Sequence, residues 1–153
     1  TGELLIANPY FLPYPSILRS LLRASRRGVV IRLLLPAESD VPIIRLLSRG
    51  TYGQLLRAGI EIYEMQHHIL HAKLMLIDGS RTIIGSANMD QRSFHRNYEI
   101  NAHVHCQDFS SQVRIRLLDD LSHARRITID DHKRRSLAER MTERLLRPLN
   151  LFL

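Results

Sequence analysis

The side chains of this chain that could do chemistry gather between residues 71 and 99. His71 and Lys73 stand two positions apart, so on an extended strand their imidazole and ammonium groups project from one face. A turn predicted at residues 78–81 returns the chain and brings residues 85–88, Gly-Ser-Ala-Asn, close to His71. An imidazole, an ammonium, a hydroxyl and a carboxamide at one sheet edge form a set of phosphate ligands around a nucleophile.

The remaining polar residues of this stretch have predicted supporting roles. Ser86 and Asn88 are expected to donate hydrogen bonds to non-bridging phosphate oxygens, and Gly85 lets the backbone come close. Glu99 is expected to orient His71 and keep one tautomer, the role of the acid in a catalytic triad. Taken singly, His71 also fits a structural histidine, and Ser86 fits a small residue that packing requires.

The pattern His-x-Lys-x4-Asp-x6-Gly-Ser-x-Asn, followed by an acidic residue, resembles the signature of the phospholipase D superfamily. It occurs here at His71, Lys73, Asp78, Gly85, Ser86, Asn88 and Glu99. Flanking segments resemble the C-terminal catalytic half of bacterial cardiolipin synthases. These segments are residues 8–11, 27–29, 36–40, 90–93 and 97–99.

The resemblance implies a phosphatidyl transfer that makes cardiolipin from phosphatidylglycerol through a phosphohistidine. It places His71, Lys73, Asp78 and Glu99 in the catalytic set, with Asp78 in an architectural role. Lys73, Ser86 and Asn88 would hold the phosphate of a phospholipid substrate. No cofactor is implied, and no metal, since Lys73 and the amide donors supply the electrostatic stabilisation.

Sites of this family combine two copies of the motif, and this sequence contains one, because His132-Lys133 lacks the following Gly-Ser-x-Asn. Two arrangements supply the second copy: an N-terminal lobe outside this sequence, or a homodimer. The start at Thr1, without an initiator Met and almost directly in an apolar run, favours the first. The alternative functions are a homodimeric phospholipase D or nuclease, and a non-catalytic lobe that binds membranes or nucleic acid.

The amino-acid composition of the chain limits the classes of partner that it is expected to bind. The 153 residues carry a net charge of +7 with 44% hydrophobic residues, which excludes a disordered tail and favours an anionic partner. Cys106 is the single cysteine, so the chain is not a disulfide scaffold. No aromatic run interleaves with basic residues, which favours an anionic membrane surface over nucleic acid. The expected location is peripheral, on the cytoplasmic face of a bacterial inner membrane.

The histidines near the motif do not predict a metal site. His67, His68 and His71 form one group, and His103, His105 and Cys106 form another. Neither group has a complete tetrahedral set at zinc-finger spacing. A polar loop and a strand are therefore expected there.

The pattern of apolar residues predicts the elements that position the motif. It alternates strands and helices, then gives a hairpin, a further strand and two helices. The predicted strands span residues 4–8, 29–35, 60–63, 74–77, 82–84 and 100–105, and the helices 16–27, 42–58, 109–121 and 131–146. This succession predicts an α/β fold with a mixed, mainly parallel sheet flanked by helices.

Two regions are expected: a phospholipase D-like catalytic lobe over residues 1–130 and a basic amphipathic helix over 131–153. The helix repeats apolar residues every four positions beside arginines. The apolar residues are Leu137, Met141, Leu145 and Leu149, and the arginines are Arg140, Arg144 and Arg147. This pattern fits a helix lying on an anionic bilayer, but slightly favours a helix docked on its own domain.

Overall fold

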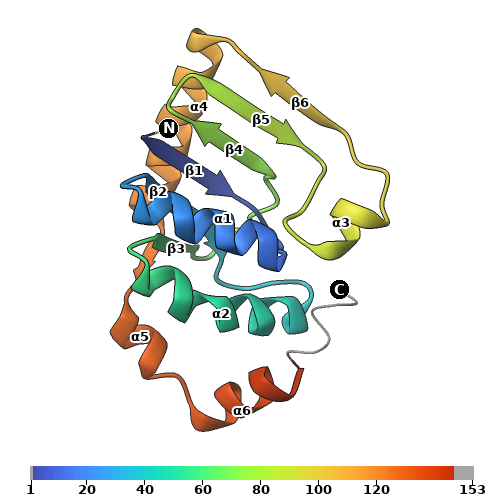
Figure 1. The fold of residues 1–153 in the computed structure, drawn as a ribbon, viewed down its shortest axis with the longest axis vertical. Coiled ribbons are helices and arrows are strands. Elements are labelled where there is room, and N and C mark those ends of the chain that lie inside the picture. Colours follow the sequence, from blue (N-terminus) through green and yellow to red (C-terminus); the bar gives the residue numbers. More distant parts are fainter. Residues whose placement is uncertain (1, 147–153) are drawn as a thin grey trace.

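The computed structural model describes residues 2–146, and its centre is a seven-stranded sheet (Figure 1). The strand order is β6-β5-β4-β1-β2-β3-β7. The strands are β1 (Glu3–Ala7), β2 (Val30–Pro36), β3 (Glu61–Met65), β4 (Leu74–Ile77), β5 (Arg81–Gly85), β6 (Asn101–Val104) and β7 (Arg125–Ile127).

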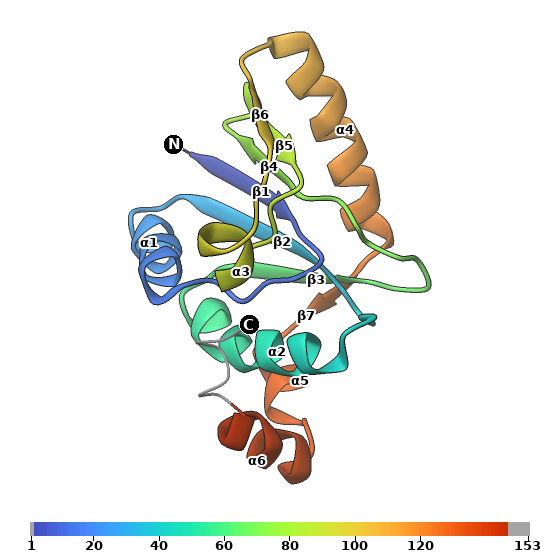
Figure 2. The same ribbon diagram turned by 90° about the vertical axis from the view of Figure 1, so that its right-hand side faces the viewer.

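Helices cover both faces of the sheet (Figure 2). α1 (Pro15–Arg26) and α2 (Pro42–Arg57) lie on one face, and α4 (Gln107–His123) lies on the other. Three short helices complete the described chain. They are α3 (Gln91–His95), α5 (Ile129–Lys133) and α6 (Leu137–Leu146). The predicted α/β architecture with helices flanking a mixed sheet is confirmed.

The proportion of parallel pairing differs from the prediction. β1, β2 and β3 pair in parallel, as a strand–helix alternation requires. The other pairings in residues 2–146 are antiparallel: β1 with β4, β4 with β5, β5 with β6, and β3 with β7. The expectation of a mainly parallel sheet is therefore wrong. β4, β5 and β6 form an antiparallel meander on one side of the parallel strands, and β7 pairs antiparallel with β3 on the other side.

Successive side chains of each strand point to opposite faces of the sheet, and this divides the core into two layers. On β2, Ile31, Leu33 and Leu35 belong to the cluster that α1 and α2 cover. Leu34 points to the opposite face and belongs to the cluster with Leu117 of α4. All four β2 side chains are almost fully buried, so the sheet is fixed between two apolar layers and its carboxyl edge is held rigidly.

Ion pairs continue from strand to strand on the α4 face. Arg114 of α4 lies 3.2 Å from Glu3, which lies 2.8 Å from Arg32 of β2. Arg32 in turn contacts Glu61 of β3 at 2.8 Å, and Glu61 contacts Arg126 of β7 at 2.8 Å. Networks of this kind contribute more than isolated surface pairs, and this one connects α4 to four strands.

Two elements were not predicted, and one was predicted wrongly. α3 lies in a segment expected to be a polar loop, and β7 was assigned to no strand. The single helix expected over residues 131–146 is divided into α5 and α6, because Thr128 and Ser136 each cap a new helix start. The expected continuation of this helix over residues 147–153, with Leu149 and Arg147, lies outside the described residues.

Candidate functional site

Apart from Asp78, the motif residues lie at the edge of the sheet where the parallel strands β1, β2 and β3 end. The predicted hairpin is confirmed, since β4 and β5 pair antiparallel and the Gly85 N–H donates to the Lys73 carbonyl at 3.2 Å. His71 and Lys73 come just before β4 rather than on it. The hairpin therefore places Ser86 beside the segment that carries His71.

Ser86 and Glu99 form the most closely connected pair of the site. The Ser86 hydroxyl donates to the Glu99 carboxylate, and the Ile100 N–H donates to the Ser86 oxygen at 3.0 Å. The Asn97 amide also donates to Glu99, at 3.3 Å. Hydrogen bonding, above all from Ser86, holds the pKa of Glu99 below its usual value. Among the described residues Glu99 makes no hydrogen bond with His71, so its role in orienting that imidazole stays a prediction.

Lys73 lies between two acidic groups. Its ammonium donates to the His71 carbonyl oxygen at 2.9 Å, and its side chain is partly buried. Burial lowers the pKa of Lys73, whereas the negative charges of Glu99 and Asp40 oppose that shift. The cation is thus fixed beside His71, with one carboxylate from the β5–β6 side and one from the loop after β2.

Tyr10 and Asp40 form a second polar pair, and neither residue was among the predicted catalytic or phosphate-binding residues. The Tyr10 hydroxyl donates to both Asp40 carboxylate oxygens, at 2.7 and 2.8 Å. This bond raises the pKa of Tyr10 to about 12 and lowers the pKa of Asp40. Both residues follow parallel strands, β1 and β2, and ligand sites gather beyond such strand ends, which is the signal that could have found them.

A cavity of about 490 Å³ opens beside His71. It lies among the segments that follow β1, β2 and β3, and its polar lining includes Tyr10, Asp40, His67, His68 and His71. Its volume falls in the range of small-molecule sites. The cavity can therefore admit a phosphodiester and part of the groups attached to it.

Asn88 lies in a loop that Asn8 holds in place. Asn8, buried at the end of β1, accepts from the Met89 N–H at 3.2 Å and donates to the Ala87 carbonyl at 3.5 Å. The Asn88 N–H donates to the Ser93 hydroxyl at 3.0 Å. The Asn88 side-chain oxygen is buried and accepts no hydrogen bond within residues 2–146. An orphaned acceptor of this kind suits a donor from a bound molecule or a partner surface.

Asp78 lies at the opposite end of β4 from His71. It stands in the β4–β5 turn with φ of 52°, in the left-handed region. Its carboxylate accepts from the backbone N–H groups of Gly2 at 2.6 Å and Glu3 at 3.1 Å. These bonds lower its pKa. Asp78 therefore joins the start of β1 to the hairpin and does not reach the group around Lys73.

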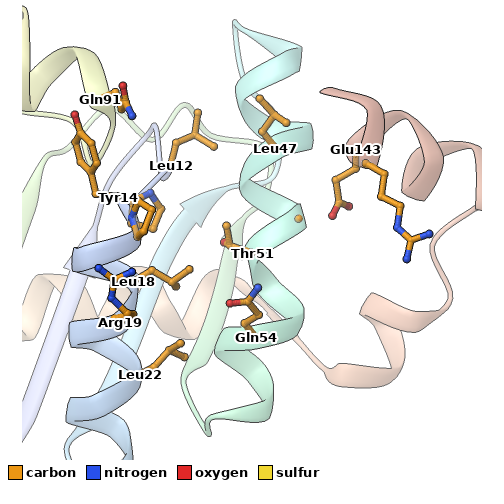
Figure 3. Close-up of a pocket in the computed structure, with 14 residues that line it drawn as sticks. Leu12, Tyr14, Leu18, Arg19, Leu22, Leu47, Thr51, Gln54, Gln91 and Glu143 are labelled. Carbon is orange, nitrogen blue, oxygen red and sulfur yellow. The ribbon is translucent and has the colours of Figure 1, made fainter. Parts of the chain in front are cut away.

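A larger cavity, of about 590 Å³, lies between α1 and α2 (Figure 3). Leu12, Leu18, Leu22 and Leu47 form much of its apolar lining, and Glu143 of α6 reaches its edge. No motif residue lines it. The smaller cavity, in contrast, is lined by His71 and lies at the strand ends.

Residues 2–146 contain neither a cluster of metal-ligating side chains nor a membrane-spanning helix. No three His, Cys, Asp or Glu side chains in this part of the chain gather where they could hold a metal ion. None of its helices has the length and apolar character needed to cross a bilayer.

Gly85→Ala is expected to lower stability by about 1–3 kcal/mol, the usual cost of overpacking. A methyl group there would lie 2.2 Å from the Ile100 carbonyl oxygen and 2.7 Å from the Asn101 Cα, which are backbone atoms that cannot move aside. Gly50→Ala is the matched control, since its methyl group meets only the flexible end of Glu143. Thermal unfolding and hydrogen exchange of the β6 amides measure both; equal effects of the two variants would contradict the prediction.

Comparison with known proteins agrees with the geometry. Residues 1–122 match the family model described as the PLD-like domain of cardiolipin synthase. A cardiolipin synthase from Geobacillus sp. is 41% identical over 147 residues, a match that covers 94% of this chain but only 29% of that protein. This chain thus spans less than a third of the length of that relative.

Solved structures show the same fold. Nuc, a phospholipase D family member from Salmonella typhimurium, superposes with a TM-score of 0.72 at 18% identity, covering 83% of this chain and 82% of that one. Phosphatidylserine synthase from Haemophilus influenzae superposes with a TM-score of 0.73 at 10% identity, covering 97% of this chain and 39% of that one. The resemblance read from the motif is confirmed: this chain belongs to the family of phospholipase D-like domains of cardiolipin synthases.

Proposed function

We propose that this chain is one catalytic lobe of a phosphatidyltransferase that makes cardiolipin from phosphatidylglycerol. The observation that carries the proposal is the grouping of His71, Lys73, Ser86 and Asn88 at the edge of one sheet, beside the 490 Å³ cavity that His71 lines. The identity of about 40% to proteins named cardiolipin synthase supports the same substrate class.

The reaction has two steps at phosphorus. An imidazole nitrogen attacks the phosphodiester of one phosphatidylglycerol, the bond to its glycerol headgroup breaks, and a second imidazolium gives that oxygen its proton. Free glycerol leaves and a phosphohistidine remains. The second imidazole then takes the proton of a hydroxyl on another phosphatidylglycerol, whose oxygen displaces the histidine. The products are one cardiolipin and one glycerol, and His71 is one of the two imidazoles.

The other side chains bind the phosphate and stabilise its charge. Lys73 supplies a positive charge, held by the His71 carbonyl oxygen, and the negative charges of Glu99 and Asp40 favour its protonated form. Asn88 donates through its amide to a non-bridging oxygen. Ser86 positions Glu99 through the hydrogen bond between them and adds a further contact to the phosphate. Glu99 remains the proposed partner that orients His71.

A second motif-bearing lobe completes the site. Around the motif the apolar side chains of Ile69, Tyr98 and Ile100 are strongly exposed, with Ile69 at 95% and Ile100 at 79%. An exposed apolar rim marks a surface that another surface covers. We propose that an N-terminal lobe of the same polypeptide covers it and contributes the second histidine. The Geobacillus relative is more than three times as long as the matched segment, which supports this arrangement.

The proposed location is peripheral, on the cytoplasmic face of a bacterial inner membrane. Both proposed substrates are bilayer lipids, so the site must approach a membrane surface. The excess of basic residues favours an anionic surface, which phosphatidylglycerol provides.

A homodimeric phospholipase D or nuclease is the second candidate. The observation that favours it is that this chain covers most of Nuc, so a chain with one lobe of this fold exists in the superfamily. In that arrangement a second copy of this chain would cover Ile69 and Tyr98 and bring its own His71. A non-catalytic lobe is disfavoured, because every position of the motif is occupied.

The test uses the intact protein with phosphatidylglycerol vesicles and follows lipid products and free glycerol. Cardiolipin and glycerol in equal amounts are expected. Phosphatidic acid without cardiolipin, or cleavage of DNA, would replace the proposal by the second candidate. Protein without vesicles and vesicles without protein are the controls for background hydrolysis.

A further inference from the structure

α6 carries a row of exposed apolar side chains. Leu137, Met141 and Leu145 recur at intervals of four, which places them along one side of the helix. Their exposed fractions are 74%, 71% and 79%. We call these three residues the α6 stripe. Single exposed apolar residues are ordinary, but a continuous row on one helix is not explained by packing within residues 2–146.

The opposite side of α6 is anchored to the rest of the lobe. Ser136 and Glu139 form a reciprocal cap at its start, with bonds of 3.3 and 3.1 Å. Glu143 accepts from Arg135 at 2.9 Å and points toward α2 (Figure 3). Leu146 packs on the cluster of Leu12, Ile44 and Leu47. The helix is therefore held by one side, below α2 in the view of Figure 1, and the side chains of the α6 stripe are exposed.

The charges around the α6 stripe are positive. Arg134, Arg140 and Arg144 are exposed and form no ion pair with any residue in 2–146. Arg134 also lines a cavity of about 370 Å³ together with Arg49 and Glu64, and Arg144 lines the 590 Å³ cavity. The two nearby acids are already engaged, Glu139 in the helix cap and Glu143 with Arg135. The surface thus combines an apolar row with three uncompensated guanidinium groups.

We propose that α6 is the surface by which this lobe docks on an anionic bilayer. Leu137, Met141 and Leu145 enter the boundary between headgroups and acyl chains, and Arg134, Arg140 and Arg144 lie at the level of the lipid phosphates. The proposal rests on the proposed function in that both concern anionic phospholipid. The sequence left open whether this helix lies on a bilayer or on its own domain, and the structure provides one face for each.

Site-specific fluorescence in the intact protein tests the docking, because it reports on α6 even if other segments also bind the membrane. The starting variant is Cys106→Ser, with any other reactive thiols replaced, since Cys106 is exposed. An environment-sensitive fluorophore is attached after Met141→Cys. The control is Ile115→Cys on α4, where the natural side chain is also 71% exposed.

With vesicles containing phosphatidylglycerol, the probe at position 141 is expected to shift to the blue and to be quenched by spin-labelled acyl chains, and the probe at 115 to remain unquenched. With phosphatidylcholine alone, or in high salt, quenching at 141 should fall several-fold. Replacing Arg134, Arg140 and Arg144 by Gln should produce the same fall. The matched control replaces Arg23, Arg26 and Arg27, three exposed arginines of the α1 end, and should leave quenching unchanged.

Two outcomes overturn the proposal. One is equal, low quenching at 141 and 115 with phosphatidylglycerol vesicles. The other is a blue shift at 141 without vesicles that grows with protein concentration, which identifies a second copy as the occupant.

An activity assay separates this proposal from the proposed function. Leu137→Gln/Met141→Gln/Leu145→Gln should lower turnover of vesicle substrate by about tenfold or more, given the cost of losing three apolar contacts. Turnover of a short-chain phosphatidylglycerol dissolved as monomers should be unchanged. An unmodified protein that makes no cardiolipin from either substrate contradicts the proposed function, whereas quenching at 141 still decides the docking.

Discussion

Replacing His71 by alanine in the intact protein is expected to lower cardiolipin formation by at least about 10³-fold, with little change in the free energy of unfolding. His71 is exposed at the mouth of the 490 Å³ cavity, and none of its described side-chain contacts supports the fold. Its removal deletes one of the two imidazoles that the transfer requires. The residual rate would come from phosphate binding by Lys73, Ser86 and Asn88.

His105→Ala provides the control for this experiment. His105 is exposed just after β6, away from the cavity lining, and its replacement should leave turnover within about twofold. Cardiolipin formation from labelled phosphatidylglycerol measures both variants, and hydrogen exchange verifies that both are folded. A His71→Ala protein that retains a tenth or more of the natural rate would remove His71 from the mechanism.

Arg49→Met is expected to lower the free energy of unfolding by about 3–5 kcal/mol, the usual cost of leaving a buried charge without its partner. Glu64 of β3 is 3% exposed. It accepts from Arg49 Nε at 3.0 Å and from Nη2 at 2.8 Å, and more weakly from the Tyr52 hydroxyl at 3.3 Å. Without Arg49 the buried carboxylate keeps only the hydrogen bond from Tyr52, in a cavity of about 370 Å³ that Arg125 and Arg135 also line.

The double variant Arg49→Met/Glu64→Gln tests this explanation, because it removes the buried charge as well and should recover most of the loss. Arg116→Ala is the control for an exposed pair: Arg116 is 76% exposed, lies 3.6 Å from Asp119, and should cost less than about 1 kcal/mol. Hydrogen exchange of the β3 amides gives the local free energy of opening. A single variant as stable as the double variant would contradict the prediction.

The sequence predicted best those structural features that are formed by residues close together in the chain. The hairpin between His71 and Ser86 follows from two apolar runs and a turn within a few residues. The sequence also contains the signal that the last segment forms two helices. Thr128 and Ser136 each stand three positions before an acidic residue, which is the pattern of a capping box. The apolar period begins only at Leu137, after Ser136, and the prediction of one helix from residue 131 overlooked that cap.

Contacts between distant segments were beyond the sequence. Asn8 and Met89 stand 81 positions apart, and nothing local indicates that one buried side chain holds the other's backbone. Tyr10 and Asp40 likewise meet only because β1 and β2 are parallel neighbours. The antiparallel pairings of β4 with β1 and of β6 with β5 were also not indicated, because the apolar pattern of a strand does not report the direction of its neighbour.

The bonds from Asp78 to Gly2 and Glu3 also determine how a covalently attached lobe could reach the site. β1 lies in the middle of the sheet, and its amino end meets the β4–β5 turn, whereas its carboxyl end meets the cavity. A linker that leads into Gly2 would enter the sheet on the side away from His71. At about 3.3 Å per residue, it would have to run back along the five-residue strand, roughly 16 Å, before its lobe could face the cavity. The length and stiffness of that linker would then decide how firmly the two halves of the catalytic centre are held together.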